Sequence, residues 1–180
     1  MGKLLKISVV AVLAGLFLVA VPIDAAYAQS AGKIFKQRQS VMRELNGHVK
    51  AVRKFVKGPK AGLSRRKLKK AIRKLGYPGD MELRAQAIAG QSKRLMRYFP
   101  KGTSFADGVG KTRAKPVIWA RWDDFKAAAA NLGKLANGLE KAAATGDKGK
   151  IKAALSAMGK KGCGGCHKNF RAKKKKKRSS

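Results

Sequence analysis

Five residues near the C-terminus constrain this chain more than any other feature. The segment Cys163-Gly164-Gly165-Cys166-His167 has the form C-x-x-C-H, the attachment sequence of c-type haem. Two thiols at this spacing can each bond one vinyl group of a haem, while the adjacent imidazole binds the iron. The sequence therefore predicts one haem c per chain, with Cys163 and Cys166 as covalent attachment points and His167 as proximal iron ligand.

Three other interpretations of the pentapeptide are weaker. A thioredoxin-like redox pair begins a helix after a strand, and no segment here shows strand alternation. A zinc site needs four ligands, whereas the whole chain has two cysteines and two histidines. A chance occurrence fits poorly with the helical, exported context described next.

Apolar residues recur at helical spacing over most of the chain. This periodicity predicts four main helices, at 31–57, 80–99, 116–146 and 147–171, with a short basic helix at 64–75 and a loop at 101–115. Asp80 and Asp147 are candidate N-caps. The pattern predicts an all-α, antiparallel up-down-up-down four-helix bundle whose haem lies near the C-terminal helix.

The N-terminus has the pattern of a secretory signal peptide. Lys3 and Lys6 precede an apolar run, and Ala26-Tyr27-Ala28 is a small-x-small cleavage site. The run is shorter than the roughly 20 residues that span a bilayer. We therefore expect a signal peptide at 1–28, a periplasmic cytochrome domain at 29–171 and a basic tail at 172–180.

The charge is extreme, with 43 Lys and Arg against 9 Asp and Glu and a formal net charge of +34. Such a surface is expected to attract acidic redox proteins or an anionic membrane surface. Specific nucleic-acid binding is not expected, because no base-reading module is present. Self-repulsion favours a monomer over the alternative, a homodimer.

Three ordered segments resemble the cytochrome c′ family. Cys163–Arg171 resembles its C-x-x-C-H-x-x-[FY]-R, Arg38–Met42 its R-Q-x-x-[LM] and Lys115–Trp119 its [KR]-P-x-I-W. The resemblance implies a four-helix bundle around one haem, with Arg171 beside the proximal pocket. The chain departs from the family in its basic segment 60–74, its loop at 105–113 and its lysine tail.

Met42 stands where the resemblance implies a residue on the distal side of the haem. A leucine there implies five-coordinate iron that binds nitric oxide or carbon monoxide, whereas a methionine implies His/Met ligation and low-spin iron. The sequence thus predicts a one-electron carrier of the methionine-ligated branch, with the gas-binding protein as the alternative if Met42 is only core packing. Arg38, one turn earlier, either reaches a haem propionate or is solvated. No acid/base pair or nucleophile indicates an enzyme.

Overall fold

Helices make up most of the computed structural model, which describes residues 23–108 and 110–173. The predicted signal peptide lies outside the described residues up to position 22, and the tail does so from position 174. The α-helices are α1 (Ile23–Lys57), α2 (Arg65–Leu75), α3 (Pro78–Arg94), α4 (Val117–Ala120), α5 (Trp122–Ala144), α6 (Lys148–Ala157) and α7 (Gly165–Phe170). In the part described, no helix is both long and apolar enough to cross a membrane.

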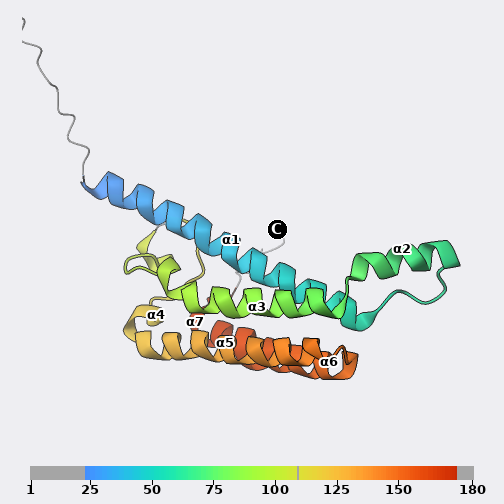
Figure 1. Ribbon diagram of the computed structural model, residues 1–180. Coiled ribbons are helices and arrows are strands. Elements are labelled where there is room, and N and C mark those ends of the chain that lie inside the picture. Colours follow the sequence, from blue (N-terminus) through green and yellow to red (C-terminus); the bar gives the residue numbers. More distant parts are fainter. Residues whose placement is uncertain (1–22, 109, 174–180) are drawn as a thin grey trace, which may run out of the picture.

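Four helical rods form an antiparallel bundle (Figure 1). The rods are α1, α3, α5 and a C-terminal rod in which α6 continues through the π-helical turn Met158–Gly164 into α7. α3 packs against α1 and α5, α5 packs against α6, and α6 returns to α1, which closes the bundle. The predicted all-α four-helix fold is confirmed.

α3 and α5 make the most extensive contact in the bundle because small residues line their seam. Ala85, Ala89 and Ser92 of α3 are buried, as are Ala129 and Ala136 of α5. The approach is closest at Gly133, where an added Cβ would lie 2.7 Å from the Ser92 Oγ. A glycine at this point therefore lets the two backbones come together.

Of the two predicted N-caps, the structure confirms one and contradicts the other. Asp147 caps α6 as predicted, since its Oδ1 accepts hydrogen bonds from the backbone N–H groups of Gly149 (2.7 Å) and Lys150 (3.0 Å). Asp80 is not the N-cap of α3, because the helix begins two residues earlier at Pro78. The Asp80 carboxylate instead reaches back to accept from the Tyr77 N–H at 2.7 Å.

The predicted third helix is interrupted at its start. Arg121, at φ −123° and ψ 53°, leaves helical geometry and separates α4 from α5. Asp123 and Asp124 then occupy the first turn of α5, where carboxylates stabilise the positive end of the helix dipole. This acidic pair is the sequence signal that a new helix begins there.

Candidate haem site

The C-x-x-C-H segment lies where the C-terminal rod changes its winding. Cys163 belongs to the π-helical turn Met158–Gly164, whereas Cys166 and His167 belong to α7. π-helical turns inside α-helices are frequent at functional sites. The periodicity of the sequence predicted one continuous helix here and did not reveal the turn.

A glycine in this turn brings the rod close to α5. A Cβ on Gly162 would lie 3.1 Å from the Leu132 Cδ1 and 3.4 Å from the Leu135 Cδ1, and Gly162 is buried. The turn is thus pressed against α5 immediately before the first cysteine. This packing fixes the position of the two cysteines relative to α5.

Both thiols face apolar surroundings. Cys163 and Cys166 are free and half-buried. Burial raises the pKa of the Cys163 thiol, and burial followed by the neighbouring Cys163 raises the pKa of Cys166 to about 11. An apolar macrocycle fits this environment, and the two thiols supply its attachment points from adjoining turns of one rod.

The His167 imidazole has the properties of an iron ligand. It is half-buried, and its pKa is lowered by burial first and then by the positive charges of Arg171 and Arg113. A lowered pKa favours the neutral ring, which is the form that binds metals. Within the described residues the ring makes no hydrogen bond, so both ring nitrogens are uncommitted.

Two apolar clusters meet at the cysteines. We call the first the main cluster; it runs along the bundle and includes Val52, Ile88, Leu139 and Ile151, and Cys163 packs against it. We call the second the aromatic cluster, and Cys166 packs against it; its buried members are Phe99, Ala114, Ile118, Phe125 and Phe170.

The aromatic cluster is held by edge-to-face ring contacts. The Phe125 ring centroid lies 4.7 Å from that of Phe99 and 5.1 Å from that of Phe170. Trp119 closes one side, since its indole N–H donates to the Phe99 carbonyl oxygen at 3.0 Å. These contacts form a rigid apolar wall beside Cys166.

Met42 is half-buried on α1 and contacts both clusters. The structure thus brings Met42 into the apolar region that also receives the two cysteines. Met96 lies in the 3₁₀ turn Leu95–Tyr98 after α3. Like Met42, it is half-buried and contacts both clusters. The sequence analysis did not single out Met96, and its only signal is a spacing of eight residues from the core residue Ile88.

Arg38 is buried, with 6% of its surface exposed. Its guanidinium donates to the carbonyl oxygens of Tyr98 (2.8 Å) and Thr103 (3.0 Å) and to the hydroxyls of Thr103 (2.6 Å) and Thr112 (3.1 Å). It also stacks over the Phe99 ring at 4.1 Å. Arg38 is therefore not solvated. It binds three points of the segment 98–112 to α1, and we call this arrangement the Arg38 clamp. Its contact with a haem propionate stays a prediction.

Arg171 follows α7 and is exposed, and its positive charge helps to lower the pKa of His167. The chain around it is tied to the loop before α4. The Lys115 N–H donates to the Phe170 carbonyl oxygen at 3.1 Å, and Arg113 Nε donates to the Ala172 carbonyl oxygen at 2.7 Å. The loop thereby holds the C-terminal end of α7.

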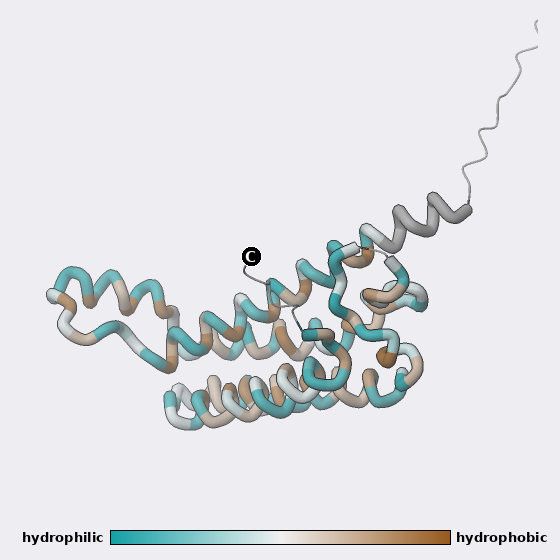
Figure 2. The backbone as a smooth tube through the Cα atoms, turned by 180° about the vertical axis from the view of Figure 1, so that it is seen from behind, coloured by the Kyte–Doolittle hydropathy of each residue, from teal (hydrophilic) through white to brown (hydrophobic). Residues whose placement is uncertain are grey.

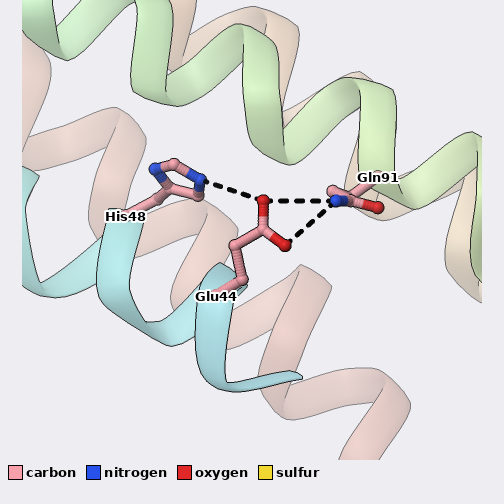
Figure 3. Close-up of polar contacts among 3 residues, drawn as sticks. All are labelled: Glu44, His48 and Gln91. Atoms are coloured by element: carbon pink, nitrogen blue, oxygen red, sulfur yellow. Dashed lines mark hydrogen bonds and ion pairs between the residues drawn. The ribbon is translucent and has the colours of Figure 1, made fainter. Parts of the chain in front are cut away.

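The other histidine, His48, lies elsewhere on the bundle. Its Nε2 is 3.8 Å from Glu44 Oε1, and the Gln91 side-chain amide donates to both Glu44 oxygens at 3.2 Å (Figure 3). This polar group joins α1 to α3, and the His48 side chain is 20% exposed rather than directed fully to solvent.

Comparisons with known proteins agree with this arrangement. The family model described as Cytochrome C′ matches residues 66–171. A cytochrome c′ of Pararhodospirillum photometricum is 34% identical over 134 residues, covering 74% of this chain and 92% of the relative. One from Rhodospirillum rubrum is 41% identical over 98 residues, covering 54% and 64%. A cytochrome c-556 of Agrobacterium tumefaciens is 30% identical over 147 residues, covering 80% and 100%.

Solved structures show the same fold. One is a cytochrome c′ described as having an unusual ligand-controlled dimer dissociation, with a TM-score of 0.63 and 23% identity, covering 79% of this chain and 97% of that one. Another is a nitric oxide complex of a mutant cytochrome c prime from Alcaligenes xylosoxidans, with a TM-score of 0.60, 24% identity and the same coverage.

Proposed function

The chain belongs to the cytochrome c′ family, whose members hold one covalent haem c per chain, and from this premise we propose that it binds a small gas such as nitric oxide or carbon monoxide. Its two most similar relatives above are named cytochrome c′, and one structural neighbour is a nitric oxide complex. The proposal assigns binding and no catalysed reaction.

The observation that carries the proposal is the packing of Met42. Its side chain contacts the two apolar clusters, which already account for a methionine at this position. The apolar wall of the aromatic cluster, which Met42 contacts, repels charged and strongly hydrated ligands but admits an uncharged diatomic molecule. Haem iron supplies the bond to that molecule.

The other residues hold and shield the group. Cys163 and Cys166 would attach it, and the imidazole of His167, whose lowered pKa favours the neutral form, would bind its iron. Arg38 fixes the position of Phe99, because it donates hydrogen bonds to the backbone carbonyl oxygens of Tyr98 and Thr103 on either side of it. This keeps the apolar wall in one arrangement and restricts the entry of water.

A second candidate is the electron carrier that the sequence analysis favoured. It requires the Met42 thioether to bind the iron opposite His167, which gives low-spin iron with a filled ligand set. The methionine itself and the similarity to proteins named cytochrome c-556 favour this candidate. Besides the packing of Met42, the greater similarity to proteins named cytochrome c′ supports the main proposal over this candidate.

Visible absorption of the purified holoprotein separates the two candidates. The reduced protein is titrated with carbon monoxide, and the gas-binding proposal expects a large, saturable change in the haem bands. A spectrum unaffected by saturating carbon monoxide contradicts the proposal and supports the electron carrier.

We also propose that the mature protein is periplasmic, that residues 29–171 form the haem domain and that the strong positive charge favours a monomer. One structural neighbour is described as a cytochrome c′ whose dimer dissociates under the control of a ligand. The molar mass of this protein in solution should therefore be measured with and without gas. Light scattering on the ferrous protein provides this, and a dimer under both conditions contradicts the monomer.

A further inference from the structure

α2 projects from the bundle at the end away from α4 and α7 (Figure 1). It packs sparsely against α1, and none of its residues is buried. Glycines at φ +73° (Gly62) and +81° (Gly76) lie on either side of it. The helix therefore adds little to the core, although it is well formed.

The charge on α2 is of one sign. Seven of its 11 residues are basic and none is acidic; the basic residues are Arg65, Arg66, Lys67, Lys69, Lys70, Arg73 and Lys74. Like charges four residues apart destabilise a helix, as do cations in its first turn. The Ser64 side chain does not relieve this, because it makes no capping hydrogen bond. An anionic partner would remove the repulsion.

α2 also carries an apolar stripe that the rest of the fold covers only in part. Leu68, Ile72 and Leu75 follow at spacings of four and three, which places them on one helix face. Leu68 and Leu75 are half-buried, whereas Ile72 is 51% exposed. Figure 2 shows the few hydrophobic positions set among hydrophilic ones along this helix.

Exposed apolar side chains continue into the next segment. Of the four large hydrophobic residues exposed in the described part of the chain, three lie between positions 72 and 83: Ile72, Tyr77 (71%) and Leu83 (64%). A helix with a cationic face and an apolar face is typical of segments that lie in the interface of a membrane.

We propose that α2 docks the protein on an anionic phospholipid surface, with its Lys and Arg residues among the headgroup phosphates and Ile72 inserted between the lipids. An acidic protein or a nucleic acid would satisfy the charges but would leave the aliphatic stripe without a role. A lipid surface satisfies both. Docking at α2 would hold the end of the bundle with α4 and α7 away from the contact.

Vesicle sedimentation of the mature holoprotein, followed by haem absorbance, tests the proposal. Vesicles of phosphatidylglycerol and phosphatidylcholine are compared with pure phosphatidylcholine at several salt concentrations. We expect binding to the anionic vesicles only, weakening as salt rises. Equal binding to neutral vesicles overturns the proposal.

Paired variants separate docking by α2 from general attraction. Lys69→Gln/Lys70→Gln is expected to weaken binding roughly 25-fold, at about fivefold for each charge near the surface. The matched control Lys152→Gln/Lys160→Gln removes two exposed lysines of the C-terminal rod and should change binding far less. Equal losses in both variants contradict docking through α2.

Ile72→Gln tests the lipid directly, since Ile72 is half-exposed and its replacement leaves the core intact. We expect on the order of tenfold weaker vesicle binding from the lost apolar contact, with heparin binding unchanged. Unchanged vesicle affinity in Ile72→Gln would show attraction to any polyanion and overturn the proposal. The result is independent of how the haem iron is ligated.

Discussion

Arg38 and Thr103 are joined across 65 residues of sequence by a 2.6 Å hydrogen bond from the Arg38 Nη2 to the Thr103 hydroxyl. The Thr103 carbonyl oxygen accepts a second bond from Nη1 of the same guanidinium. Burial lowers the pKa of Arg38 to about 10, which still leaves it charged at neutral pH. One buried cation on α1 thus holds the loop that leads to α4.

Replacing Arg38 should destabilise the holoprotein strongly. Arg38→Met leaves the acceptors of Tyr98 and Thr103 without a donor, and we expect a loss of about 2–4 kcal/mol in the free energy of unfolding. Denaturant unfolding measures it. Arg43→Met on the exposed side of α1 is the control, and an equal loss there would contradict the clamp.

The close packing of α3 on α5 predicts that substitutions at Gly133 and Ser92 have non-additive effects on the free energy of unfolding. Gly133→Ala gains helix propensity but forces the Ser92 Oγ away from its 2.7 Å bond to the Ala89 carbonyl oxygen. In a Ser92→Ala background the nearest Ser92 atom is the Cβ at 3.8 Å, so the alanine fits. A double-mutant cycle should give a coupling on the order of 1 kcal/mol, and strict additivity contradicts the packing described.

The cap of α6 predicts a pH dependence. Hydrogen bonds from the backbone N–H groups of Lys150 and Gly149 lower the pKa of the Asp147 carboxyl below its ordinary 3.8. Because the folded pKa lies below the unfolded one, the stabilisation is complete above pH 3.8 and is lost as the pH falls through the folded pKa. Asp147→Asn keeps a capping side chain without a charge.

We therefore expect the midpoint of unfolding to lie at a higher denaturant concentration for the wild type than for Asp147→Asn at neutral pH. The two midpoints should converge in acid. Glu140→Gln, which removes a carboxylate far from any helix N-terminus, is the control for a change in net charge. A difference between wild type and Asp147→Asn that stays constant with pH would contradict the role of the carboxylate.

Met42 and Met96 both contact the main and aromatic clusters, so their leucine variants can be compared with each other. If Met42 packs without binding the iron, Met42→Leu and Met96→Leu both leave the spin state of the resting haem unchanged. Visible and electron paramagnetic resonance spectra measure it. A change from low to high spin in Met42→Leu alone would assign the thioether to the iron.

The bundle could be predicted from local signals in the sequence. Helical periodicity predicted the four rods, which the structure confirms, and the spacing of Cys163, Cys166 and His167 predicts the haem attachment, which stays a prediction; both depend on neighbouring residues. Asp147 was predictable as a cap for the same reason.

Features that depend on residues far apart in the sequence were not predictable in this way. The acceptors of Arg38 lie 60 or more residues away, so its role as a clamp required the folded chain. Met96 reaches the same two clusters as Met42 because α3 and the 3₁₀ turn after it pack against α1. The π-helical turn at Met158–Gly164 follows from packing against α5, which periodicity does not encode.

The visible spectrum of the ferrous holoprotein, recorded before and after addition of carbon monoxide, tests the central claim most directly. Gas binding at a haem held by Cys163, Cys166 and His167 predicts a broad high-spin spectrum that carbon monoxide converts to that of a six-coordinate complex. A sharp low-spin spectrum that carbon monoxide does not alter, and that is lost in Met42→Ala, would contradict it.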